Sequence, residues 1–357
     1  MLPRILRWTH THVKRLRRSQ RTTLAYLVTG LIEGGRAGVA AIGRSLPGAA
    51  YGKHKIKRTD RFLGNGRIDL AVLSQTLLSW ASCGDGRLVL AWDWTDLPGG
   101  RKLLSLAVPT RGRALPVHGR VVDERRMWKS QNFLEEGMLA ELKALLPFGT
   151  RVVIVADRGF GRTRLMRRCR ELGLSFVLRV EGRAVFRHRG VKRSVKGLAL
   201  RRGQTLWFRE ADYRDEDPET VQLVLTWRQR MKEPWYLATD LELPPQQVIA
   251  LYGRRMQIEE SFRDLKSIRW GFKLRQVRLH DCERWERLLL VVGLATLLLM
   301  AVGAQAERDH RHHRFMANTV RRRRTLSWMT VGRACIRDYL PALARCVRLL
   351  RPCLVQV

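Results

Sequence analysis

The chain has 357 residues and carries 68 lysines and arginines against 32 aspartates and glutamates, a formal net charge of +36. This length allows two or three domains with a substantial buried core. The charge far exceeds what solubility requires, and such a surface attracts polyanions by neutralising phosphates and releasing counterions. Nucleic acid is therefore the expected partner.

The cysteines and the apolar segments argue against other classes of protein. The six cysteines lack the paired short spacing of zinc sites, and no cleavable signal peptide is recognisable, so we expect reduced thiols in a cytoplasmic protein. One apolar run, residues 288–304, is shorter than the roughly 20 residues of a membrane-spanning helix and contains glycines. We expect a buried core helix and no membrane partner.

Residues 1–85 are predicted to form a helical DNA-binding region. Apolar residues recur with helical spacing in residues 24–34 and 70–82, on either side of a basic connection at 53–67. A further basic run at 321–324 indicates that the footprint on a polyanion is wide. The alternative to DNA binding for any single basic cluster is an ordinary solvent-exposed face. The alternative for the helices is a purely structural role.

Residues 86–180 have the pattern of an α/β sheet. Three β-type runs between residues 87 and 122 are separated by Gly and Pro turns and predict an antiparallel meander. A helical segment at 132–146 and a continuous apolar strand at 151–156 follow. Strand, helix and strand together complete a parallel crossover.

The second half of the chain is predicted to contain three further parts. Several β-type runs predict a β-rich insertion at 181–240. The remainder of the sheet region then occupies 241–310, and a basic helical tail occupies 311–357.

The segment 251–266 predicts an amphipathic helix. At roughly 100° per residue, four of its polar side chains fall within an arc of about 60°. These are Tyr252, Arg255, Glu259 and Lys266. A neighbouring apolar stripe would pack on a core, which fits a catalytic helix and equally fits an ordinary amphipathic surface helix.

Two aspartates, Asp93 and Asp157, accompany apolar runs typical of buried strands. If those strands are neighbours, both carboxylates and that of Glu259 share one small volume, where three like charges require cations. Carboxylates suit Mg²⁺, and two such ions about 4 Å apart activate a nucleophile and stabilise the leaving oxygen of a phosphodiester. Asp96 is a rival of Asp93, and Asp157 could instead anchor a turn.

The spacing of Tyr252, Arg255, Glu259 and Lys266 matches the Tyr-Arg-Glu-Lys signature of bacterial insertion-sequence transposases of the DDE class. The chain resembles this family over nearly its whole length, in the blocks KHKIKRTDRFLGN, AWDWTD, ADRGFG, KEPWYLATDL and FMANTVRRRRTLS. Within the family it is most similar to the transposase of the tetracycline-resistance transposon, and more distantly to that of the kanamycin-resistance transposon.

The resemblance implies a fold and a set of catalytic groups. The fold is a ribonuclease-H-like mixed α/β sheet with a β-rich insertion before the glutamate. Asp93, Asp157 and Glu259 are implied to be the catalytic acids and to bind two Mg²⁺ ions, for which Mn²⁺ can substitute.

The reaction implied by the resemblance is cut-and-paste transposition. Water nicks each transposon end, the freed 3′-hydroxyl attacks the opposite strand to form a hairpin, a second water opens the hairpin, and the 3′-ends join target DNA. Tyr252, Arg255 and Lys266 are implied to contact the DNA backbone near the terminal nucleotides. A flipped base is implied to stack on Trp235, for which a place in the core of a buried strand is the alternative.

The implied partners are double-stranded DNA, as the terminal inverted repeats and the target, and a second copy of the chain. Synapsis of two ends requires a homodimer in which each protomer cuts in trans, although the tail after residue 328 is brief for the family. The expected location is the bacterial cytoplasm, in association with the nucleoid. Two alternatives are a ribonuclease-H-fold nuclease without strand transfer and a catalytically inactive DNA-binding relative, which the presence of all three acids disfavours.

Overall fold

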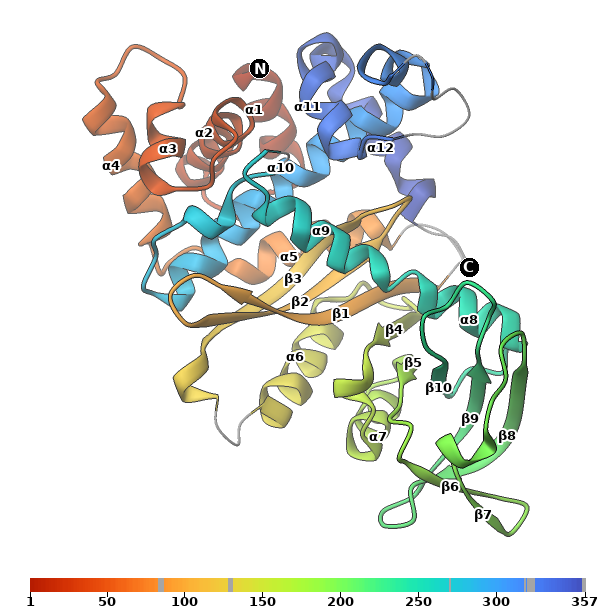
Figure 1. Ribbon diagram of the computed structural model, residues 1–357. Coiled ribbons are helices and arrows are strands. Elements are labelled where there is room, and N and C mark those ends of the chain that lie inside the picture. Colours follow the sequence, from red (N-terminus) through yellow and green to blue (C-terminus); the bar gives the residue numbers. More distant parts are fainter. Residues whose placement is uncertain (83–86, 128–130, 270, 318, 320–324, 355–357) are drawn as a thin grey trace.

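The computed structural model describes residues 1–82, 87–127, 131–269, 271–317, 319 and 325–354, and Figure 1 shows the path of the chain. The basic run at 321–324 lies outside these residues, as does Cys83. In the described part of the chain, Cys169, Cys282, Cys335 and Cys346 are free thiols.

Within residues 1–82 the chain forms five helices, in agreement with the helical region predicted there. They are α1 (Leu2–His12), α2 (Arg18–Gly34), α3 (Val39–Arg44), α4 (Gly52–Leu63) and α5 (Leu70–Ala81). The prediction of a basic connection at 53–67 is wrong, because most of that segment is α4. Lysine and arginine are good helix formers, and Thr59, Phe62 and Leu63 give this helix a buried face.

The four strands predicted for the sheet region are present, and a fifth strand follows them. They are β1 (Leu88–Leu97), β2 (Arg101–Pro109), β3 (Ala114–Asp123), β4 (Val152–Ala156) and β5 (Ser175–Arg179). The first three form the predicted antiparallel meander, and β4 lies parallel to β1, with Trp92 opposite Ala156. This arrangement is consistent with a ribonuclease-H-like fold.

The region predicted to be a β-rich insertion continues the same sheet. Its strands are β6 (Val185–His188), β7 (Val191–Ser194), β8 (Thr205–Tyr213), β9 (Glu219–Thr226) and β10 (Trp235–Thr239). In the described residues the strand order is β3-β2-β1-β4-β5-β10-β9-β8-β6-β7, and β10 pairs antiparallel with both β5 and β9. Figure 1 shows these strands at the end of the molecule farthest from α1 to α4.

Helices cover both faces of the sheet. On one face lie α6 (Gln131–Leu145) and α7 (Thr163–Glu171), and α8 (Pro245–Gly253) and α9 (Met256–Lys266) cross the other (Figure 1). After them come α10 (Cys282–Arg308), α11 (Trp328–Tyr339) and α12 (Leu343–Leu354).

The buried core helix predicted at 288–304 is part of α10. This helix is long and apolar enough to cross a membrane, but 89% of its most apolar stretch is buried inside the protein, against α2, α5, α11, α12 and β3. Its backbone approaches α11 closely, since a Cβ atom on Gly332 would lie 1.8 Å from the carbonyl oxygen of Leu299. α10 thus joins the sheet to the helical layers at both ends of the chain.

Candidate active site

The alternation of side chains along β1 aims two sets of residues at opposite faces of the sheet. Trp92 and Trp94 point toward α6, where the Trp94 indole donates a hydrogen bond to Glu135 Oε1 (2.8 Å). Asp93 and Thr95 point toward the opposite face, where both contact side chains of the 251–266 segment. The strand therefore presents Asp93 to the predicted catalytic helix.

Asp157 directly follows β4 and opens a short helical turn, Arg158–Phe160. Its Oδ1 accepts a hydrogen bond from the backbone N–H of Gly159 at 2.9 Å. Because β1 and β4 are parallel neighbours, Asp157 lies at the same edge of the sheet as Asp93. Asp157 does anchor a turn, and this role is compatible with ligand binding because a carboxylate has several acceptor positions.

The prediction of a single helix over 251–266 is wrong, because α8 ends at Gly253 and α9 begins at Met256. The backbone N–H groups of Arg254 and Arg255 donate to carbonyl oxygens three residues back (3.1 and 2.9 Å), so the chain tightens into a turn there. Gly253, the last residue of α8, is a poor helix former and stands at this break.

Arg255 joins two of the three predicted catalytic acids. One guanidinium nitrogen lies 3.1 Å from Asp93 Oδ2, and another forms an ion pair with Glu259 one turn further along α9. The Arg255 side chain is 8% exposed and that of Asp93 is 16% exposed, whereas that of Glu259 is 40% exposed. The acids from β1 and α9 are thus brought together through a buried cation.

The pKa of Asp93 reflects its burial and the charges of its neighbours. Burial raises the pKa of Asp93 to about 6, and Arg255 opposes that rise, while the negative charges of Asp157 and Glu259 add to it. Both charges therefore lie within electrostatic range of Asp93. The ionised site therefore holds more negative charge than Arg255 balances.

The three carboxylates have the chemistry of a magnesium site. Hard oxygen donors are the ligands that Mg²⁺ prefers, and the excess negative charge favours a cation. As placed, no set of three His, Cys, Asp or Glu side chains in the described part of the chain is arranged to hold a metal ion. Between Asp93 and Glu259 the position of a cation is taken by the Arg255 guanidinium.

The other members of the four-residue signature surround this cluster. Lys266 Nζ donates to Thr95 Oγ1 at 2.6 Å, and burial lowers the pKa of Lys266. The ring of Tyr252 is buried (1% exposed) and meets the ring of Trp235 edge to face, with 4.8 Å between centroids. Trp235 is only partly buried at the start of β10, so the two interpretations of this tryptophan both stay open.

Asp96, the rival of Asp93, is a surface residue. Its side chain is 83% exposed and pairs with Lys102 at 3.5 Å. Positions 93 and 96 differ by an odd number, so the alternation of the strand sends the two aspartates to opposite faces. The placement of Asp96 suits a surface ion pair.

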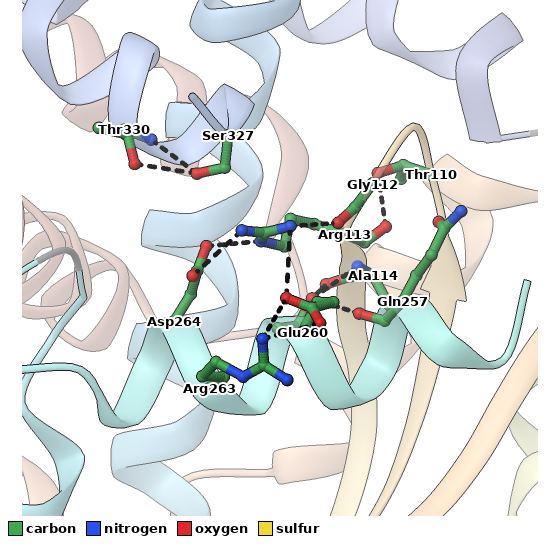
Figure 2. Close-up of polar contacts among 11 residues, drawn as sticks. Thr110, Gly112, Arg113, Ala114, Gln257, Glu260, Arg263, Asp264, Ser327 and Thr330 are labelled. Carbon is green, nitrogen blue, oxygen red and sulfur yellow. Dashed lines mark hydrogen bonds and ion pairs between the residues drawn. The ribbon is translucent and has the colours of Figure 1, made fainter. Parts of the chain in front are cut away.

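A second set of polar contacts fixes α9 on the sheet. Arg113, in the turn between β2 and β3, reaches Asp264 with two nitrogens, at 2.6 and 3.3 Å (Figure 2). Ser261 accepts a hydrogen bond from Ala114 N (2.6 Å) and donates to Ala114 O (3.0 Å). These contacts hold the helix that carries Glu259.

Two further groups near the aspartates, Glu135 and Arg162, belong to none of the sequence motifs. Glu135 lies on the helical face of α6 that also carries Met138, Leu139 and Leu142, all of them buried. A charged residue on an apolar stripe was the signal that could have revealed it.

A comparison with protein families gives the site its context. A family model described as transposase DDE domain matches residues 85–298, which is more than half of the chain and includes Asp93, Asp157 and Glu259. The chain belongs to this family. No curated protein matches it. Membership implies DNA binding and a transposition-related function with catalytic phosphoryl transfer, and members of the family generally use divalent metals.

Proposed function

We propose that the protein is an active DNA transposase that moves an insertion sequence by cut-and-paste transposition. The observation that carries this proposal is that Arg255 pairs with both Asp93 and Glu259, while a third carboxylate, Asp157, follows the neighbouring parallel strand and adds to the negative charge acting on Asp93. Structural ion pairs do not require such an excess of like charge.

The three acids would hold two Mg²⁺ ions, and Mn²⁺ would substitute. When bound, these ions supply activation of the attacking oxygen and stabilisation of the leaving oxygen of a phosphodiester. For the carboxylates to close on a cation, Arg255 has to leave its position between Asp93 and Glu259. Its guanidinium is then available for a DNA phosphate, which is the role that the family resemblance implies.

The remaining signature residues position the DNA. Lys266 and Arg255 offer cationic groups to the backbone near the cleaved end, beside Tyr252. Trp235, in contact with Tyr252, offers an aromatic face on which a base displaced during hairpin formation can stack.

The proposed reaction proceeds through nicking, hairpin formation, hairpin opening and strand transfer. Two transposon ends have to be brought together, so a homodimer in which each protomer cuts in trans is part of the proposal. Its substrates are the terminal inverted repeats and target DNA, in the nucleoid of a bacterial cytoplasm. The net charge of +36 supports the required contacts with phosphates.

The test is cleavage of a labelled transposon-end duplex by the purified protein with Mg²⁺, resolved on a denaturing gel. The end sequence is taken from the DNA that flanks the gene, and Asp157→Ala is run in parallel. Nicks followed by a slowly migrating hairpin, absent with the variant, are the expected result.

Other outcomes would select the alternatives. Cleavage without a hairpin or joined product would favour a nuclease of the same fold. Binding of the end with no product that depends on Mg²⁺ would favour an inactive DNA-binding relative.

A further inference from the structure

Behind the strands that carry the two aspartates lies a buried carboxylate with no part in the proposed chemistry. Glu135 of α6 is 0% exposed, and glutamate is almost never fully buried unless it is paired. Its Oε1 accepts hydrogen bonds from the Trp94 indole (2.8 Å) and the Gln131 amide (2.9 Å). Its Oε2 forms an ion pair with Arg162. Both oxygens are bonded, which offsets the cost of burial.

One side of this arrangement reaches Asp93. Trp94 follows Asp93 on β1, and its backbone N–H donates to Asp93 Oδ1 at 2.9 Å. Its indole lies on the opposite face of the sheet, bonded to Glu135. Residue 94 therefore contacts the aspartate through its main chain and the buried glutamate through its side chain.

The other side reaches Asp157. Arg162, paired with Glu135, also donates to the carbonyl oxygen of Gly159 at 2.7 Å. The N–H of Gly159 in turn donates to Asp157 Oδ1 at 2.9 Å. A connected set of contacts thus runs from the turn after β4, through Glu135, to the end of β1.

We propose that Glu135 is a positioning residue that ties the Asp93 strand to the Asp157 turn and so sets the spacing of the two carboxylates toward the metal ions. This inference rests on the proposed function, because it concerns the same two acids. Residues that hold metal ligands in place typically change metal affinity by about 10–100-fold when they are replaced.

The neighbouring residue Glu136 is a matched control. It lies on the same helix and also pairs with an arginine, Arg164, at 2.7 Å, but that arginine is 70% exposed. In the part of the chain that the structure describes, neither side chain bonds to Trp94, to Arg162 or to the turn that carries Asp157. Glu136→Gln therefore removes one charge and one ion pair from α6 and leaves the positioning contacts in place.

The experiment is titration of the purified full-length protein with Mn²⁺, with the free ion measured by electron paramagnetic resonance. Wild type is compared with Glu135→Gln, Glu136→Gln, Trp94→Phe and Asp157→Ala, and the fold of each is checked by circular dichroism. Glu135→Gln is expected to lower Mn²⁺ affinity by about tenfold or more, with cleavage partly restored at higher Mn²⁺. Trp94→Phe, which removes only the indole donor, is expected to lower it less, and Glu136→Gln to leave it unchanged.

Two results would overturn the inference, and they differ from each other. If Asp157→Ala loses Mn²⁺ but folded Glu135→Gln binds it as wild type does, the metal site stands and Glu135 is only structural. If Asp157→Ala binds Mn²⁺ as well as wild type, the proposed metal site fails and the role of Glu135 fails with it. Should Glu135→Gln not fold, unchanged affinity in Trp94→Phe would likewise show that Glu135 is only structural.

Discussion

Both faces of α9 carry ion pairs between arginine and carboxylates, but the pairs have different roles. On the face toward the β2–β3 turn, Arg113 meets Asp264 in a two-pronged pair and lies 4.0 Å from Glu260, which also pairs with Arg263, so two arginines balance two carboxylates (Figure 2). On the face toward β1, Arg255 meets the carboxylates of Asp93 and Glu259, and a third carboxylate, that of Asp157, acts on Asp93. The first face is complete as a structural contact, and the second retains negative charge.

This difference separates an ion pair that fixes a helix from one that marks a site. A balanced, partly buried pair stabilises the position of an element. A cluster in which like charges raise the pKa of a neighbour resists ionisation until a cation arrives. Variants on the two faces should therefore affect different measurements.

The largest effect is expected from Glu259→Ala. This change removes one proposed metal ligand but leaves the basic surface, so end cleavage should fall by about a thousandfold or more while end binding persists. Gel cleavage and mobility-shift assays on the same labelled duplex measure the two quantities. Loss of specific binding along with cleavage would mean that Glu259 supports the structure.

A smaller effect, confined to one step, is expected from Trp235→Ala. Stacking of a base on an aromatic ring contributes about 1–3 kcal/mol, so hairpin formation should slow by about tenfold or more while first-strand nicking is spared. A time course of the two products resolves them. If both steps slow equally, Trp235 is a core residue of a buried strand and has no specific role in hairpin formation.

Replacement of Arg255 should separate metal binding from catalysis. Arg255→Ala removes the positive charge that competes with an incoming ion, so the free protein should bind Mn²⁺ about tenfold more tightly. Cleavage of end DNA should nevertheless fall, because a phosphate contact is lost. Weaker Mn²⁺ binding in the variant would contradict the idea that the guanidinium stands in a cation position.

Replacement of Arg113 should affect stability and leave metal affinity unchanged. Arg113→Ala leaves a mostly buried Asp264 without this partner, and the expected loss is about 1–3 kcal/mol in the free energy of unfolding. Urea denaturation measures it. Arg263→Ala, which removes an exposed pair from the same helix, is the control and should change stability by less than about 1 kcal/mol.

The smallest effect is expected from Asp96→Asn. Its carboxylate is exposed and paired with Lys102, so both cleavage and Mn²⁺ affinity should match wild type. The same substitution at Asp93 should lower cleavage about as much as Glu259→Ala does, because it also alters a proposed metal ligand. Equal losses at the two positions would place Asp96 in the catalytic site.

Much of the fold follows from local patterns in the sequence. The apolar run before Asp157 and the helix ahead of it predict a parallel crossover, and β4 does lie beside β1. The helix α4 does not follow from composition, because its dense basic charge is equally typical of a surface connection. The break between α8 and α9 was missed because helical spacing continues across Gly253.

The site was predictable in its residue types but not in its pairings. The spacing of Arg255 and Glu259 by four residues predicts that they share a face of a helix. That Arg255 also meets Asp93 depends on the placement of α9 against β1, which lies far away in the sequence. The same holds for Glu135, whose partners beyond its own helix come from β1 and from the segment just before α7.

The most direct test of the account is a crystal structure of the protein bound to its transposon end and soaked in Mn²⁺, examined by anomalous scattering. The account predicts anomalous peaks within ligand distance of Asp93, Asp157 and Glu259, with Arg255 moved away from the two carboxylates toward a phosphate. A complex in which Arg255 still pairs with Asp93 and Glu259, and the peaks lie elsewhere, would contradict it.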